Sequence, residues 1–225
     1  MYSFRYLFMP KSSEMYSEDS EERVGELYSR VVWWIFIITV PAFLYMFAFS
    51  SEILSVFFGP EFSAGGTVLR VLLFGSFFAA NAGPLEELFI AMGDTKKSLM
   101  ITITIAVING FINFILIPRY GFMGAGVALT SSFLLGKLFG LWLYRRGGGI
   151  LPYGSKFVRV LVLSLLSITP FYFLDMFLIS EPLVLSISLT GFLTIFFSGI
   201  YFGKLLEKED RKLLSELLTG LKDLF

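Results

Sequence analysis

The sequence lacks cysteine and histidine altogether. Without cysteine the chain has no disulfide and no thiol nucleophile, and without either residue it has no Cys/His zinc site. The absence of histidine also excludes Ser-His-Asp and Cys-His catalysis. The sequence therefore predicts a protein that is not an enzyme and that holds no metal and no cofactor.

Charged residues are scarce, at 16% of the 225 residues, against roughly 25% in an ordinary soluble domain. Lys plus Arg and Asp plus Glu each number 18, so the zero net charge gives no sign of a nucleic-acid partner. Hydrophobic residues make up 56% of the chain, and its mean hydropathy is +0.76. This composition is typical of a membrane protein.

Long apolar runs dominate the sequence. A bilayer core about 30 Å thick requires roughly 20 apolar residues of helix, and six runs approach or exceed this length. They cover residues 31–49, 67–92, 98–117, 122–144, 157–178 and 183–203. We therefore predict an all-α, polytopic membrane helix bundle with six transmembrane helices within residues 31–203.

The basic residues are distributed unequally between the connections. If all six runs cross the membrane, all but three of the 18 Lys and Arg residues lie on one side. The exceptions are Arg119 on the other side, and Arg70 and Lys137 inside runs. Because cytoplasmic loops carry the excess of Lys and Arg, we expect a multi-pass protein of the cell membrane with both termini cytoplasmic.

Two flanking segments are predicted to be cytoplasmic and helical. In residues 1–30 we expect the end of a missing helix, then an amphipathic helix opened by Asp19 and Glu22 as a capping box. Residues 204–225 carry leucines at helical spacing, which favours an amphipathic helix along the membrane surface or against the bundle. A solvated tail is the alternative for this second segment.

Ionisable residues inside the apolar runs need an explanation, because a charge at the centre of a membrane helix costs roughly 2.5–3.5 kcal/mol. Arg70 lies near one end of its run, and Glu86 and Glu87 lie near the other end. Counted from the cytoplasmic ends of their runs, Glu86 and Lys137 lie about 9 and 10 Å deep. We predict that Lys137 pairs with Glu86 or Glu87; extension of each side chain to the interface is the alternative.

Three further patterns predict how the helices are shaped and packed. Asn81, Gly83 and Pro84 interrupt the second run, so we expect a kink there, against protein or a cavity. Asn109 and Asn113 share one helix face, for which interhelical hydrogen bonding and solute contact are both open. Small residues that predict close packing against more than one neighbour recur in the fourth run at Gly124, Ala128, Ser132, Gly136 and Gly140.

Several of these segments resemble one known family when they are read in order. The stretch from Asn109 and Asn113 to IPRYGFMGAG at residues 117–126 resembles a helix-pair signature of prokaryotic polysaccharide flippases. These flippases belong to the multidrug/oligosaccharidyl-lipid/polysaccharide exporter superfamily. Agreeing pieces are Met9-Pro10, Tyr28-Ser29-Arg30, Pro41, Glu52-Ile53-Leu54, Phe58-Gly59-Pro60 and Ala91 to Lys96, so that the resemblance covers about residues 1–145.

The resemblance implies one lobe of a two-lobe transporter that moves lipid-linked oligosaccharides by alternating access. The chain resembles the C-terminal lobe, so the implied partners are membrane lipid, a lipid-linked oligosaccharide, and a missing N-terminal lobe or second chain. Lys137 and Arg70 are the implied contacts of the lipid phosphate, and Asn109 and Asn113 the implied polar lining. Glu86 and Glu87 would either neutralise that charge or titrate with a coupling ion.

Other functions remain open on the sequence alone. A cation-coupled multidrug exporter of the same superfamily is one, and it would have an acidic and aromatic cavity where a flippase has a basic one. A truncated scaffold or remnant that does not transport is another. A membrane glycosyltransferase is a weaker alternative, because no end of a run offers a paired acidic motif in an exposed loop.

Overall fold

The computed structural model describes residues 21–177, 182–203 and 205, in which helices are the only regular secondary structure. The chain divides into two compact units, Met1–Tyr153 and Gly154–Phe225. The predicted helix end before residue 10, the cap at Asp19 and the predicted helix beyond residue 205 lie outside the described residues.

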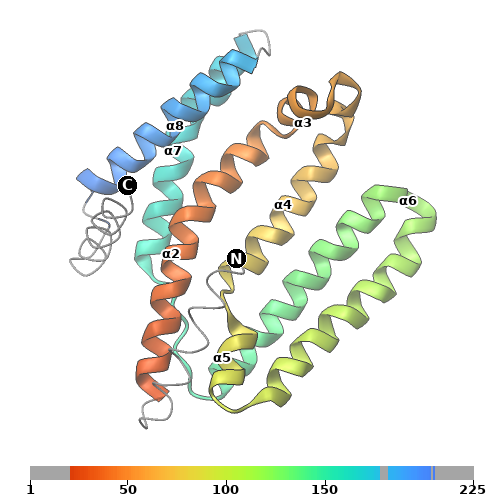
Figure 1. The fold of residues 1–225 in the computed structure, drawn as a ribbon, viewed down its shortest axis with the longest axis vertical. Helices are drawn as coiled ribbons and strands as arrows, with labels where there is room; N and C mark the ends of the chain where they lie inside the picture. Colours follow the sequence, from red (N-terminus) through yellow and green to blue (C-terminus); the bar gives the residue numbers. More distant parts are fainter. Residues whose placement is uncertain (1–20, 178–181, 204, 206–225) are drawn as a thin grey trace, which may run out of the picture. The chain divides into compact units, whose positions relative to one another are not determined.

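The first unit is a layer of antiparallel helices (Figure 1). The long helix α4 packs against both α2 and α6, and the short helix α5 packs against α6. The elements are α2 (Glu21–Ala48), α3 (Ser50–Phe58), the 3₁₀ helix η1 (Pro60–Gly65), α4 (Gly66–Asn81), α5 (Leu85–Ala91) and α6 (Thr95–Arg146).

Helix α6 folds back on itself as a hairpin, which Figure 1 shows as two antiparallel arms that lie side by side and are joined at a bend. The bend is at Gly121, where φ is 54° and ψ is −130°, a conformation that a residue with a Cβ rarely adopts. Across the arms, a Cβ on Gly140 would lie 2.8 Å from Cδ1 of Ile101. The two predicted runs 98–117 and 122–144 are therefore the two arms of α6.

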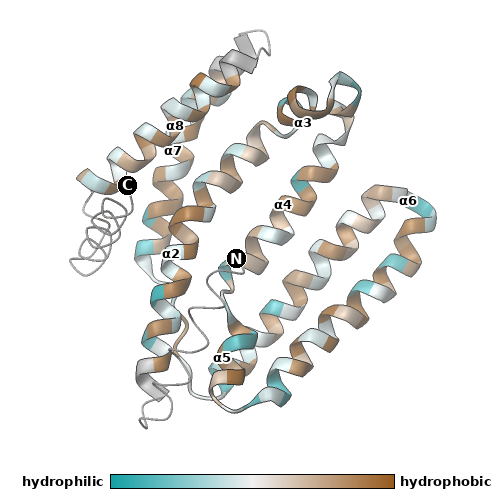
Figure 2. Cartoon of the chain, in the orientation of Figure 1, coloured by the Kyte–Doolittle hydropathy of each residue, from teal (hydrophilic) through white to brown (hydrophobic). Residues whose placement is uncertain are grey.

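Five helices of the described residues are long and apolar enough to cross a membrane. One of them is the whole of α6, which contains two of the six predicted spans because it folds back at Gly121. Figure 2 shows hydrophobic residues along most of each helix, with hydrophilic residues at the start and the bend of α6 and at a few positions within the helices. The prediction of an all-α polytopic membrane bundle is confirmed.

The two ends of the first unit differ in chemistry. Lys96 and Lys97 at the start of α6 lie near Arg145 and Arg146 at its end, because the two arms are antiparallel. We call this the basic end. The opposite end holds α3, η1 and the bend of α6, and we call it the α3 end.

The small residues of the second α6 arm form a packing surface, as predicted. The residues in this row are all buried: Gly124, Ala128, Ser132, Gly136 and Gly140. The first arm of α6 covers part of this row. Helix α4 approaches the second arm from another side. There a Cβ on Gly75 would lie only 2.7 Å from the Cα of Thr130. Two neighbours therefore use this arm.

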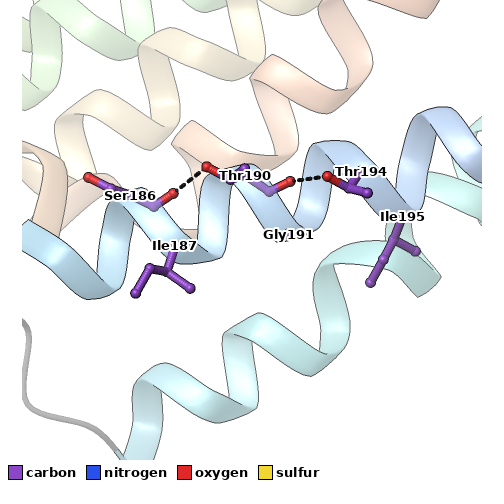
Figure 3. Close-up of a pocket in the computed structure, with 6 residues that line it drawn as sticks. All are labelled: Ser186, Ile187, Thr190, Gly191, Thr194 and Ile195. Atoms are coloured by element: carbon purple, nitrogen blue, oxygen red, sulfur yellow. Dashed lines mark hydrogen bonds between the residues drawn. The ribbon is translucent and has the colours of Figure 1, made fainter.

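The second unit consists of α7 (Ser155–Phe177) and α8 (Pro182–Phe202) packed on each other. Close approach is possible because Gly191 faces the ring of Phe171 and Gly199 faces Leu163. An open groove, lined by Ser186, Ile187, Thr190, Gly191, Thr194 and Ile195, runs along α8 (Figure 3). The hydroxyls of Thr190 and Thr194 donate to carbonyls one turn earlier, so the groove offers few free donors.

Candidate functional site

Lys137 and Glu86 form an ion pair inside the first unit. Nζ of Lys137 lies 2.6 Å from one carboxylate oxygen of Glu86 and 2.8 Å from the other. The two side chains are only 14% and 18% exposed, so neither extends to the surface. The predicted pairing, which rested on equal depth in two helices, is confirmed.

Burial determines what the ion pair contributes. Moving both charges out of water costs several kcal/mol per ion, and their attraction and hydrogen bonds offset this cost. Removing one partner leaves a half-buried charge without its partner, which costs less than the roughly 3–5 kcal/mol typical of a fully buried pair. Lys137 and Glu86 therefore stabilise each other's charge inside the unit.

Helix α5 carries both predicted carboxylates in its first turn. Glu86 faces the second arm of α6, and Glu87 on the next position is buried. The helix begins after Pro84, which cannot donate a backbone hydrogen bond. The predicted kink is thus confirmed as a complete break between α4 and α5.

Two glycines with positive φ lie on either side of α5. Gly83 has φ 70° before it, and Gly93 has φ 75° after it. A Cβ on Gly83 would lie 2.5 Å from Cγ2 of Val32, so this position excludes side chains for both conformation and space. Helix α5 is therefore a two-turn segment between two sharp changes of chain direction.

The carbonyls freed by the break have partners from elsewhere in the unit. The hydroxyl of Tyr28 donates to the carbonyl of Ala82 at 2.6 Å, and the hydroxyl of Tyr153 donates to that of Asn81 at 2.8 Å. The amide of Asn81 donates to Thr39 Oγ1 at 3.1 Å. The sequence did not predict that Tyr28, Thr39 and Tyr153 bind this break, because no periodicity links them to residues 81–84.

Asp94 fixes the start of α6 directly after α5. Its carboxylate accepts from the backbone N–H of Lys97 at 3.2 Å and lies 2.8 Å from Nζ of the same residue. The hydrogen bond from Lys97 lowers the pKa of Asp94 below its ordinary value. This cap satisfies one of the free N–H groups of the helix and places a negative charge at its positive end.

The structure does not bring Arg70 to the ion pair. Its Nε donates to the carbonyl of Phe47 at 3.0 Å, at the end of α2 where carbonyls have no helical partner. Arg70 lies roughly 16 Å along α4 from Asn81, towards the α3 end. In this conformation its contacts tie α4 to the end of α2.

Asn109 and Asn113 lie on one face of the first α6 arm, as their spacing predicts. The amide of Asn113 donates to Oδ1 of Asn109 at 2.9 Å, and the amide of Asn109 donates to Oγ of Ser132 at 3.3 Å. The second bond joins the two arms, which supports interhelical hydrogen bonding. Oδ1 of Asn113 is buried and has no hydrogen-bond partner in the described part of the chain.

Comparison with known proteins identifies a family and several relatives of this chain. A protein family described as "Lipid II flippase MurJ" matches residues 1–202. The capsular polysaccharide biosynthesis protein CapF of Staphylococcus aureus is 26% identical over 145 residues, which cover 64% of this chain and 36% of CapF. The probable low-salt glycan biosynthesis flippase Agl15 of Haloferax volcanii is 28% identical over 131 residues, covering 55% of this chain and 26% of Agl15.

A third relative extends over more of the sequence. The uncharacterized membrane protein MJ1068 of Methanocaldococcus jannaschii is 21% identical over 200 residues, which cover 89% of this chain and 39% of MJ1068. The chain thus spans well under half the length of these curated relatives. The family match includes every described helix of both units, and the chain belongs to the lipid II flippase MurJ family.

Proposed function

We propose that this chain is one lobe of a transporter that moves lipid-linked oligosaccharide or polysaccharide precursors across the cell membrane by alternating access. The observation that carries the proposal is the ion pair of the half-buried Lys137 with the carboxylate of Glu86. We infer that an anionic ligand takes the place of this carboxylate. Family membership and the names of the relatives support the transport of such precursors.

In this proposal Lys137 contacts the phosphate of the lipid-linked substrate. A phosphate oxygen and a carboxylate oxygen accept from a lysine in the same way, so the substrate takes the place of Glu86. Glu86 neutralises Lys137 while the site is empty, which avoids an unpaired buried cation. Asn109 and Asn113 supply polar lining. Arg70 contacts the phosphate once α4 separates from the end of α2.

Helix α5 is the proposed moving element of this lobe. It carries Glu86 and is bounded by Gly83 and Gly93, whose backbone freedom allows the chain to change direction. Exchange of Glu86 for substrate breaks the contact between α5 and α6, and α5 then shifts relative to α6. In this proposal the shift of α5 accompanies the rocking or gating of one lobe against the other that is typical of alternating access.

The remainder of the transport pathway is proposed to come from a second lobe. The chain covers 39%, 36% and 26% of the three relatives described above, which leaves room in each for such a lobe. We place both termini and the basic end in the cytoplasm, because Lys and Arg are enriched in cytoplasmic loops. The partners proposed are this lobe, membrane lipid and the lipid-linked substrate.

The test is a flipping assay in lipid vesicles with a fluorescent lipid-diphosphate oligosaccharide. The chain is reconstituted alone and with a complementary N-terminal lobe, and we expect movement between leaflets only with both. Lys137→Gln, combined with Glu86→Gln to keep the site neutral, should slow movement by at least about tenfold, since a charge-assisted hydrogen bond is lost. Lys96→Gln, at an exposed lysine, is the matched control and should leave the rate unchanged.

Two outcomes contradict the proposal. If the two lobes together move no substrate, the chain is better explained as a scaffold that does not transport. If Lys137→Gln with Glu86→Gln moves substrate as fast as the unchanged protein, Lys137 does not contact the substrate.

A cation-coupled multidrug exporter is the second candidate, favoured by the adjacent carboxylates Glu86 and Glu87 in the first turn of α5. An exporter of this kind would move an organic cation such as ethidium in response to an ion gradient. The same vesicles loaded with ethidium distinguish the two functions. Ethidium movement that depends on Glu87 and is unaffected by lipid diphosphate would favour export.

A further inference from the structure

The α3 end of the first unit carries a group of exposed aromatic side chains. Phe57, Phe58 and Phe62 are 77%, 65% and 52% exposed, and Val56 beside them is also exposed. The rings of Phe58 and Phe62 lie 6.0 Å apart, so the end of α3 and the start of η1 present one continuous apolar surface. We call these three residues the phenylalanine group.

The position of this group along the membrane normal follows from the adjoining helices. Helix α2 is a candidate span, and the segment from Arg30 to Ala48 is about 27 Å long, close to the thickness of a bilayer core of about 30 Å. The candidate span that contains α4 begins immediately after α3. The phenylalanine group therefore lies where two neighbouring helices leave the hydrocarbon region.

Figure 1 shows how α3 is oriented in this position. It runs across the ends of α2 and α4 and does not continue either helix. Gly59, with φ 113°, turns the chain between α3 and η1. A short helix that lies across the ends of two spans, with an apolar edge, has the geometry of an element in the membrane interface.

Further large hydrophobic residues are exposed on the neighbouring helices of this end. Met46 and Phe47 near the end of α2 and Phe74 on α4 are exposed large hydrophobic residues. At the bend of α6, Tyr120 and Phe122 are exposed at the same end of the unit. Aromatic residues gather where a membrane protein crosses from hydrocarbon to headgroups.

The charges of this region favour insertion of rings over attraction to anionic headgroups. Residues 31–69, which include α3 and η1, contain no Lys or Arg, and their two charged residues are Glu52 and Glu61. The basic residues nearest to them at this end are Arg70, which donates to the carbonyl of Phe47, and Arg119 at the bend of α6. Attachment of this element is therefore apolar and independent of salt. We propose that α3 and η1 form an interfacial anchor, whose phenylalanine group inserts into the boundary between headgroups and acyl chains in the leaflet at the α3 end.

This inference goes beyond the proposed transport function and does not depend on it. Because the sequence contains no cysteine, a spin label attaches only where one is introduced. The test places single cysteines by Phe57→Cys, Phe58→Cys and Phe62→Cys, with Glu61→Cys as the control on the same element. Collision of each label with oxygen and with a water-soluble nickel chelate is measured in phosphatidylethanolamine and phosphatidylglycerol vesicles.

We expect labels at 57, 58 and 62 to collide with oxygen several-fold more often, relative to nickel, than the label at 61. The ratio of oxygen to nickel collisions should be the same at 50 mM and 500 mM salt. Electrostatic interactions are screened over about 14 Å at the lower concentration and about 4 Å at the higher one, so an electrostatic attachment would weaken. Nickel collisions as frequent as at 61 would show that the group lies in water. Labels shielded from both reagents would show that protein covers it, and either result overturns the proposal.

A second measurement covers the case in which a cysteine variant does not fold. Phe62→Trp retains an aromatic ring, and its fluorescence is measured in vesicles whose lipids carry bromine near the headgroup or near the chain ends. The anchor predicts stronger quenching by the shallow bromines after subtraction of the signal of the unchanged protein. If neither brominated lipid quenches the fluorescence, the anchor proposal is contradicted.

Discussion

The hydroxyl of Tyr28 lies 2.6 Å from the carbonyl oxygen of Ala82, to which it donates a hydrogen bond over a separation of 54 residues. This bond ties α2 to the break between α4 and α5. Both residues are buried, so the carbonyl of Ala82 has no access to bulk water when the hydroxyl is absent. The break is therefore held in part by a helix that lies far from it in sequence.

Tyr28→Phe removes this hydroxyl and leaves the ring. We expect a loss of about 1–3 kcal/mol of stability, the cost of a buried polar group without a partner. Tyr120→Phe, at an exposed tyrosine of the α6 bend, is the control and should be close to neutral. Unfolding in mixed micelles by added denaturing detergent measures both; equal stability of the two variants would contradict the importance of this bond.

Lys137 and Glu86 should show strong energetic coupling. Lys137→Gln or Glu86→Gln alone leaves one half-buried charge without its partner and should destabilise by about 1–3 kcal/mol, less than for a fully buried pair. The double variant keeps the site neutral and should recover most of that loss. A double-mutant cycle on unfolding free energies measures the coupling, and additive losses would show that the pair contributes no interaction.

Gly75 and Gly110 form a matched pair for testing helix contact. A Cβ on Gly75 would lie 2.7 Å from backbone Cα of Thr130, whereas a Cβ on Gly110 would meet nothing within 4 Å. Gly75→Ala should therefore destabilise by about 1–3 kcal/mol through overpacking of α4 against α6. Gly110→Ala should stabilise by about 0.4–1 kcal/mol, since alanine restricts the unfolded chain. The same sign for both variants would refute this contact.

Asp94 makes the stability depend on pH. Its pKa is lowered by Lys97, so the contribution is complete above the unfolded value near 3.8 and is lost as pH falls through the lower folded value. Asp94→Asn keeps a capping side chain and removes the charge. The unchanged protein should be more stable than this variant at pH 6, and the difference should vanish on acidification below the folded pKa.

The orientation of the bundle can be tested with the same cysteine-free background. Lys96→Cys and Arg119→Cys place labels at the basic end and at the bend of α6. We expect a membrane-impermeant maleimide to reach them from opposite sides of sealed vesicles. Labelling of both from one side would contradict two membrane-crossing arms in α6.

Much of the fold follows from features that the sequence displays directly. Hydrophobic length gives the spans, and depth counted from the helix ends places Glu86 level with Lys137 because both helices rise by the same distance per residue. The effect of Pro84 on the helix is also local. These predictions needed no knowledge of which helices are neighbours.

Other parts of the site depend on tertiary neighbours and could not be read in this way. Tyr28 and Tyr153 reach the break only because α2 and the segment after α6 pass beside it. Arg70 lies in an apolar run, yet its partners are carbonyls at the end of α2. The sequence indicated that each group needs a partner and not which partner it has.

The shortness of α5 determines how this segment responds when its contacts are lost. Seven residues are fewer than the roughly 12–15 that an isolated helix needs to persist in water. Its helical form therefore depends on packing and on the contact between Glu86 and Lys137. When that contact breaks, we expect α5 to unwind as it shifts and not to tilt as a rigid rod, so that its backbone amides open to hydrogen exchange.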